Sequence, residues 1–305
     1  MNFDFSSRTV FLAALVISFL MLVTAKISFS SDETVKVVFC DIGQGDAIYI
    51  RINDDIDMLI DAGQGRAVLN CLGKYMPFYD RDIELAFITH PQQDHYGGFE
   101  YVIGRYKIGA FVFPPVLNPN HSFEQLVKTI KEKGISVRYL YQDDVVNIAQ
   151  FAKLSYLWPT QDYLSERTVA DTSSPTLAGV VLGTTTDNLN NFSQVMLFSY
   201  DDFDVMLTGD STPTILDKLA NELEFPDNIE VLKVPHHGSK KGLTSKFLSA
   251  VNPKLAVISV GEKNRFGHPH KATLDMLEKA GVKYLLTSKL GDVVIDVDSS
   301  GWSIR

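Results

Sequence analysis

The feature that most constrains the fold is a repeated pattern of short β-rich runs separated by helical stretches. The first series of runs lies at 35–42, 46–52, 57–63, 84–90, 108–115, 135–140 and 153–159. The second series lies at 193–200, 204–210, 230–238, 255–261, 284–288 and 292–298. Runs of this length, rich in β-branched and aromatic residues and bounded by turn residues, predict strands. We therefore predict a layered α/β fold in one domain covering residues 35–305, with two β-sheets packed face to face and helices outside.

The stretches between these runs have helical periodicity. Residues 122–134 carry apolar side chains at 123, 126, 127 and 130, with Ser122 as the predicted N-cap and Gly134 as the end. Residues 212–223 and 271–281 follow the same pattern. Residues 160–192 are rich in Thr, Ser and Asn and have no such period, so we predict a long loop region close to the functional site.

The N-terminus has the composition of an export signal. Arg8 precedes an apolar run from Val10 to Val23, and Ala25 lies where a signal peptidase requires a small residue. The run is about 14 residues long, which is short for a helix that spans the hydrocarbon core. We predict a signal peptide at residues 1–25 and export to the periplasm or the medium. The alternative is an uncleaved membrane anchor, and contact with a membrane is expected only in that case.

Charge and cysteine content limit the classes of partner. The formal net charge is −9, which argues against a broad basic surface for nucleic acid, although a local basic groove or metal ions could still hold phosphates. Cys40 and Cys71 could pair in an oxidising compartment. Each lies in an apolar element, however, so we interpret both as free, buried cysteines. Because there is no CxxC motif, cysteine ligation of a metal is not expected.

Four of the predicted strands end in histidine or aspartate side chains. These residues are Asp61 after one strand, His90, Asp94 and His95 after the next, Asp210 after a third, and His236 and His237 after a fourth. A rigid scaffold presents ligands in this way, at the edge of its sheets. Imidazole and carboxylate ligands favour zinc, with manganese as a second candidate.

The order of motifs carries a family resemblance. DIGQGDA, LIDAG, THPQQDHYGG, LTGD, LKVPHHGS and NRFGHPH resemble, in this order, the metallo-β-lactamase fold. More narrowly, they resemble the hydrolase domain of the ComEC competence proteins and related secreted phosphodiesterases. The resemblance covers nearly the whole chain after the N-terminal segment. It implies a four-layer αββα sandwich with its metals at the sheet edge.

The resemblance also implies a lopsided set of metal ligands. The usual pattern is HxHxDH; here His90, Asp94 and His95 match it, and Gln92 replaces the second histidine. One firm site is therefore expected from Asp94, His95, Asp210 and one of the pair 236/237, with His237 favoured as the ligand. A second site, weak or absent, retains only His90 and a bridging Asp210. The fold often supplies a third histidine from a mid-chain loop, but His121, the only histidine between 95 and 236, is interpreted as a capping or surface residue.

The remaining candidates surround these ligands. We expect His236 to face the substrate, and His236 or His268 to give a proton to the leaving group. The predicted catalytic residues are therefore Asp94, His236 and His268. Asp61 is predicted to orient a ligand histidine. Arg265, His268 and His270 would hold or protonate a phosphate group.

The turn DIGQGDA leaves two interpretations open. Asp41, Gln44 and Asp46 frame a Gly-rich segment that is either a tight turn beside the metal loop or a substrate contact.

These features predict an exported, metal-dependent hydrolase of a phosphodiester or related ester, in which the metal activates a water molecule. One alternative is a ComEC-like nuclease that degrades DNA, which the acidic charge does not favour. The other is a catalytically impaired protein that binds a metal or ligand.

Overall fold

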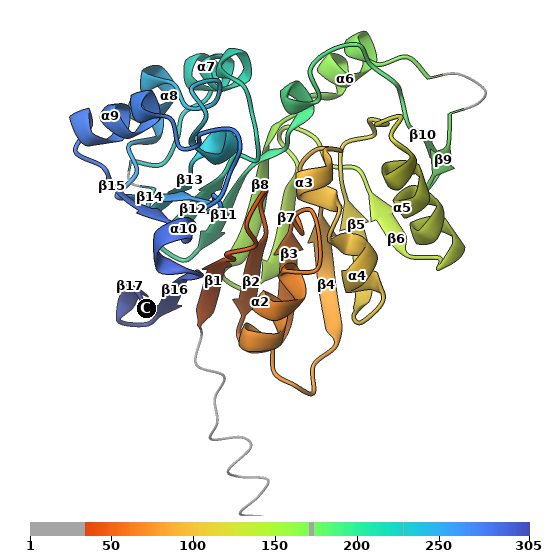
Figure 1. Ribbon diagram of the computed structural model, residues 1–305, viewed down its shortest axis with the longest axis horizontal. Helices are drawn as coiled ribbons and strands as arrows, with labels where there is room; N and C mark the ends of the chain where they lie inside the picture. The colour runs from red at the N-terminus through yellow and green to blue at the C-terminus, as the bar shows by residue number, and fades with distance from the viewer. Residues whose placement is uncertain (1–33, 171–173, 228) are drawn as a thin grey trace, which may run out of the picture.

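The computed structural model of the chain describes residues 34–170, 174–227 and 229–305 (Figure 1). The predicted signal peptide or anchor at 1–25 lies outside the described residues. Two large β-sheets pack against each other, and helices cover their outer faces (Figure 1). This arrangement confirms the predicted four-layer αββα sandwich in a single domain. Across the part of the chain that the structure describes, no helix has the length and apolar character needed to span a bilayer.

The first sheet contains eight strands among the described residues, in the spatial order β17-β16-β1-β2-β3-β4-β5-β6. Their bounds are β1 Val35–Phe39, β2 Ile48–Ile52, β3 Ile56–Ile60, β4 Asp82–Phe87, β5 Lys107–Val112, β6 Ser136–Arg138, β16 Val293–Asp298 and β17 Gly301–Ile304. Pairing is antiparallel from β17 to β3 and parallel from β3 to β6. The C-terminal hairpin β16-β17 therefore lies beside the first strand of the domain.

The second sheet contains seven described strands, in the order β15-β14-β13-β12-β11-β8-β7. Their bounds are β7 Val145–Ala149, β8 Ala152–Trp158, β11 Val195–Tyr200, β12 Phe203–Leu207, β13 Val231–Lys233, β14 Leu255–Ile258 and β15 Lys283–Leu286. The pairs from β12 to β15 are parallel. A small separate ladder joins β9 Thr176–Leu177 to β10 Val180–Val181. Parallel strands point their carboxyl ends to the same edge, which is the edge where the polar residues gather.

Helices cover the outer face of each sheet (Figure 1). On the first sheet these are α2 Val68–Tyr75, α3 Gln93–Tyr96, α4 Phe99–Ile103 and α5 His121–Glu132. On the second they are α7 Pro213–Glu222, α8 Ser245–Val251 and α9 Lys271–Lys279. The others are α6 Gln161–Arg167, α10 Thr287–Leu290 and the 3-10 turns η1 Leu189–Phe192 and η2 Pro235–Gly238.

The core follows the two-residue period of the strands. Val37 and Phe39 of β1 point between the sheets, and Val38 points outward under the helices. In β12, Val205 and Leu207 face the other sheet, while Met206 packs under the helices that cover the second sheet. Both faces of each sheet are buried, which explains why the strand runs read as almost continuous apolar segments.

Local details differ from the sequence predictions. The helix expected to start after Ser122 is capped by Asn120, whose side chain accepts a hydrogen bond from the Ser122 backbone N–H. Strands β7 and β17 were not predicted. The segment 160–192, predicted as a loop, also contains α6, the β9-β10 ladder and η1.

The cysteines are paired, so the prediction of two free thiols was wrong. Cys40 follows β1, Cys71 lies in α2, and their sulfurs form a disulfide with 5.9 Å between the Cα atoms. Both cysteines are buried in the layer between the first sheet and its helices. An apolar environment in the sequence is compatible with a free or a bonded cysteine, and only the packing of α2 on the sheet brings the two sulfurs together.

The Cys40–Cys71 disulfide is expected to stabilise the fold measurably. It closes a loop between residues 31 positions apart. The chain-entropy model gives about 3–4 kcal/mol for a loop of this size. We expect the double variant Cys40→Ser, Cys71→Ser to lose about this much free energy of unfolding in urea titrations. A reducing agent would then destabilise the parent protein and leave the variant unchanged; an unchanged parent would contradict the prediction.

Candidate metal centre

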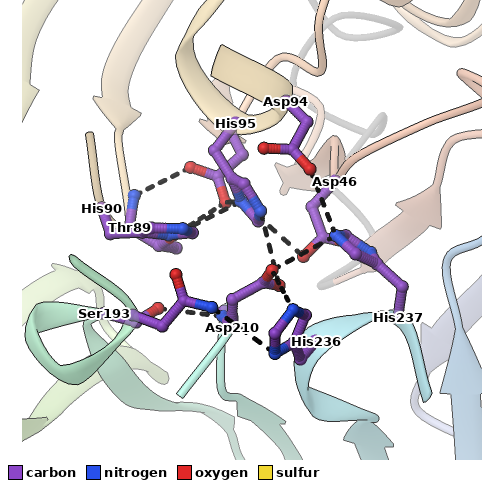
Figure 2. Close-up of polar contacts among 12 residues, drawn as sticks. Asp46, Thr89, His90, Asp94, His95, Ser193, Asp210, His236 and His237 are labelled. Atoms are coloured by element: carbon purple, nitrogen blue, oxygen red, sulfur yellow. Dashed lines mark hydrogen bonds and ion pairs between the residues drawn. The ribbon is translucent and has the colours of Figure 1, made fainter. Parts of the chain in front are cut away.

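The polar residues meet at one edge of the sandwich, where strands of both sheets end (Figure 2). Asp61 follows β3, His90 to His95 follow β4, Asp210 follows β12, and the histidine pair lies in η2 after β13. His95, Asp210 and His237 point toward a common centre from three separate segments (Figure 2). The predicted convergence of these strand ends is therefore present in the structure.

His95 is oriented by a buried carboxylate behind it. Its Nδ1 lies 2.7 Å from Oδ2 of Asp61. The same Oδ2 accepts a hydrogen bond from the hydroxyl of Thr89, and Oδ1 accepts one from the backbone N–H of Thr89, each at 2.8 Å. The Nε2 of His95 faces Asp210, 3.4 Å from Oδ1. Because the Nδ1–H donates to Asp61, Nε2 is the nitrogen left to face the centre, as in a metal-ligating histidine.

His237 is oriented by the backbone. Its Nδ1 donates to the carbonyl of Ser259 at 3.1 Å. Its Nε2 lies 3.4 Å from Asp210 Oδ2 and 3.8 Å from Asp94 Oδ2. His236 and His237 both have left-handed backbone conformations, with φ of 52° and 53°, which L-residues rarely adopt. This conformation directs the two neighbouring rings to different partners.

These atoms fit a divalent ion. Nε2 of His95, Nε2 of His237 and Oδ1 of Asp210 are buried without a hydrogen-bond partner. Two imidazoles and two carboxylates are a ligand set that zinc accepts. His95, Asp210 and His237 would hold the ion, and Asp94, the fourth ligand predicted from the sequence, faces this centre with Oδ2 3.8 Å from His237 Nε2. Asp94 is the most exposed of them, with a side chain 29% accessible, and so lies on the open side of the centre.

The electrostatics of the centre reflect its buried carboxylates. Burial disfavours a charged His95, but Asp210 and Asp61 outweigh it and raise the pKa of His95 well above its ordinary value. Burial is likewise outweighed at His237, where Asp210 and Asp46 raise the pKa to about 10. The same negative charges would attract a divalent cation.

Asp46 and Lys233 form a buried ion pair beside the centre. Asp46 was predicted from the sequence as a candidate site residue, but Lys233 was not. Asp46 is 1% exposed and makes an ion pair with the equally buried Lys233 of β13. Together with His95, Asp210 and His237, Asp46 belongs to a group whose possible ligand atoms lie within 4.8 Å of one another. Asp46 approaches the Nδ1 edges of His95 and His237, at 3.9 and 3.4 Å, whereas Asp94 and Asp210 face Nε2 atoms. We therefore place Asp46 behind the centre.

Lys233 was missed, although a lysine inside the apolar run at 230–238 was a visible signal. Its ammonium donates to the carbonyl of Gly209 at 2.9 Å and lies 3.8 Å from Asp210 Oδ1. The buried lysine therefore contacts both the turn before β2 and the residue preceding Asp210.

The Gly-rich turn before β2 packs tightly on the metal loop. Gly45 has φ +97°, and a Cβ at this position would lie 1.8 Å from the carbonyl oxygen of Asp94. The backbone N–H of Asp46 donates to that same oxygen at 3.2 Å. Of the two interpretations of DIGQGDA, this contact supports the tight turn beside the metal loop.

His90 and Gln92 do not complete a second cluster in the described part of the chain. His90 is fully buried, its Nδ1 lies 3.1 Å from the hydroxyl of Thr89, and its Nε2 has no hydrogen-bond partner. The group of possible ligands around Asp210 does not include His90. Gln92 instead lines the open pocket above the centre.

That pocket has a volume of about 500 Å³ and opens above Asp94 and Asp210. Its walls also include Gln44, Gln92, His236 and His268, and the exposed cations Lys263 and Arg265 with the aromatic ring of Phe266. Burial and the neighbouring His237, His236 and His270 lower the pKa of His268 to about 4, so it is neutral at neutral pH.

Two predicted rim residues lie away from the pocket wall. The backbone N–H of Asp41 donates to the carboxylate of Asp292 at 2.8 Å. His270 Nδ1 accepts from the backbone N–H of Lys240 at 3.2 Å, and so ties the loop after η2 to the start of α9. The structure thus gives both residues supporting contacts.

Comparison with known proteins agrees with this geometry. Residues 40–262 match the Metallo-beta-lactamase superfamily. The chain is 27% identical to ComE operon protein 3 of Bacillus subtilis (strain 168) over 284 residues, covering 87% of this chain and 33% of that protein. It is 24% identical to Recombination protein 2 of Haemophilus influenzae, covering 82% of this chain and 27% of that protein. Among solved structures, the diiron β-hydroxylase CmlA of Streptomyces venezuelae is 14% identical with a TM-score of 0.49, covering 83% of this chain and 52% of that one.

The chain belongs to the metallo-β-lactamase superfamily. Within it, the relatives are ComEC-like proteins, as the motifs predicted, and the chain contains a group of four residues that could hold a metal ion. The chain spans about a third of the length of the curated relatives it matches.

The support from Asp61 gives a test of the ligand assignment. Replacing Asp61 by Asn removes the negative charge behind His95 and one of the two oxygens that accept from His95 and Thr89, and loss of such a partner typically costs 10–100-fold in metal affinity. We expect Asp61→Asn to weaken zinc binding by about this factor in chelator competition. Asp41→Asn, at an exposed carboxylate outside the pocket wall, is the matched control and is expected to bind zinc like the parent. Equal affinity in all three proteins would contradict the assignment.

The lowered pKa of buried His90 makes the free energy of unfolding of the metal-free protein depend on pH in the acid range. Burial and the nearby His95 lower its pKa from 6.5 to about 3. Between these values the unfolded chain takes up the proton and the folded chain does not, so the contribution of His90 to stability is lost as pH falls. From pH 6.5 to 5.0 the loss is about 1.6 kcal/mol. Urea titrations of parent and His90→Gln in EDTA measure it; an identical pH dependence in both would overturn the prediction.

Proposed function

We propose that the protein is an exported, metal-dependent phosphodiesterase. The observation that carries the proposal is a buried set of imidazole and carboxylate atoms at the floor of a pocket whose rim bears exposed cations. A divalent ion held there supplies activation of a water molecule and neutralisation of charge on the reacting group. A phosphodiester is anionic, so it can use both the metal at the floor of the pocket and the cations at its rim.

The rim offers the contacts that a phosphate group requires. Lys263 and Arg265 are exposed at the pocket wall, in a chain whose net charge is −9. Arg265 also lies over the ring of Phe266, 5.2 Å from its centroid. A local pair of cations in an otherwise acidic protein favours an anionic substrate at this position. These two cations provide the local positive charge that a net charge of −9 does not exclude.

Export is supported by two independent features. The apolar run from Val10 to Val23 with Ala25 behind it has the composition of a signal peptide. The Cys40–Cys71 disulfide is a bond that persists in oxidising compartments. An uncleaved membrane anchor would satisfy both features equally well.

A nuclease is the second candidate, because one relative is named for recombination. The pocket does not distinguish a nucleic acid from a smaller phosphodiester. The third candidate is a catalytically impaired protein that binds a metal or ligand. Its support is Gln92, which stands in place of a ligand histidine.

Hydrolysis of bis-p-nitrophenyl phosphate with added zinc or manganese tests the proposal. We expect Asp210→Ala to lower kcat/KM at least about 100-fold, because losing this ligand removes several kcal/mol of charge stabilisation. Arg265→Ala is expected to raise KM about tenfold, since it removes one charge-assisted hydrogen bond. His121→Ala, at the solvent-exposed start of α5, is the control. Equal rates in the parent and Asp210→Ala would refute the enzyme, and cleavage of single-stranded DNA alone would select the nuclease.

A further inference from the structure

We propose that Asn190 is a positioning residue that fixes the tautomer of His236, so that His236 presents an N–H at Nε2 to the substrate. The statement that this N–H binds a substrate phosphate rests on the proposed function. The tautomer itself is a property of the protein and is open to separate measurement.

Asn190 lies in a firmly held turn. It belongs to η1 and is 3% exposed. The next residue, Asn191, is fixed twice: its carbonyl accepts from the indole N–H of buried Trp158, and its side chain accepts from the hydroxyl of Thr212, both at 2.7 Å. The amide of Asn190 is therefore presented from a rigid backbone, although it comes from the segment with the least regular sequence.

The two ring nitrogens of His236 face a hydrogen-bond donor on one side and an acceptor on the other. Nδ1 lies 3.4 Å from Nδ2 of Asn190, and Nε2 lies 3.8 Å from Oδ2 of Asp210. A carboxylate only accepts hydrogen bonds, so it favours a proton on Nε2. Nδ1 then carries the lone pair, which accepts from the amide N–H of Asn190. Both neighbours favour the same tautomer.

The adjacent His237 has the opposite tautomer. Its Nδ1 must carry the proton, because it faces the carbonyl of Ser259, and its Nε2 is left free to bind a metal. The roles of the two histidines are thus separated by their partners: His237 is the ligand and His236 is the donor.

His236 is placed to use this N–H. Its side chain is 22% accessible and lines the pocket, whereas His237 is 4% accessible. A fixed N–H directed into the pocket stabilises negative charge on a phosphate oxygen without reorganisation during the reaction.

The direct test is the tautomer of His236 in the zinc-loaded protein at pH 8, read from long-range ¹H–¹⁵N correlation spectra. His236→Gln identifies the signals by their loss. We expect the parent to carry the proton on Nε2. In Asn190→Asp the new carboxylate accepts from Nδ1, so the proton is expected to move to Nδ1. Asn191→Asp adds the same charge to the same turn, keeps the acceptor for Thr212 and does not touch His236, so it is expected to keep the parent tautomer.

The proposal is overturned if the parent carries the proton on Nδ1, or if Asn190→Asp leaves the tautomer unchanged. Kinetics add a second readout: Asn190→Asp is expected to lower kcat about 10- to 100-fold, with KM within about threefold and one zinc retained. If the parent hydrolyses no phosphodiester, the proposed function fails, while the spectra still decide the role of Asn190.

Discussion

The site depends on a buried ion pair between Asp46 and Lys233 that joins the two sheets. Asp46 precedes β2 of the first sheet, and Lys233 ends β13 of the second. Two buried charges are costly to desolvate, and removing one would leave the other uncompensated. The pair therefore constrains both turns at once: it fixes Gly45 against the carbonyl of Asp94, and it holds the carbonyl of Gly209 beside Asp210. Residues from opposite halves of the chain reach one centre through this contact.

Each histidine of the site is then defined by what lies behind it. A carboxylate orients His95, a backbone carbonyl orients His237, and a side-chain amide contacts His236. Four imidazoles of the same intrinsic chemistry thereby acquire different roles: two face the centre through Nε2, His236 turns an edge to the pocket, and His90 is enclosed beside Thr89.

The sequence predicted the layered fold and the strand ends that gather the ligands, because both follow from local apolar periodicity and from motifs of a few residues. It also predicted Asp61 behind a ligand histidine, which the structure places against His95. It did not predict Lys233 or Asn190, because their roles depend on partners that are distant in the chain. The prediction of two free cysteines was wrong for the same reason, since burial alone does not specify a neighbour. Asn120, two residues ahead of the predicted cap, shows that element ends are set by single side-chain hydrogen bonds.

The central claim is that the protein binds one divalent ion tightly, through Asp94, His95, Asp210 and His237. Gln92 stands where the usual pattern has a histidine, and His90 lies outside the ligand group around Asp210, so we expect the second position to be incomplete. The most direct measurement is anomalous diffraction at the zinc edge from crystals of the dialysed protein. The account predicts one peak, within bonding distance of Nε2 of His95 and His237. Two peaks of equal occupancy, one of them on His90, would contradict it.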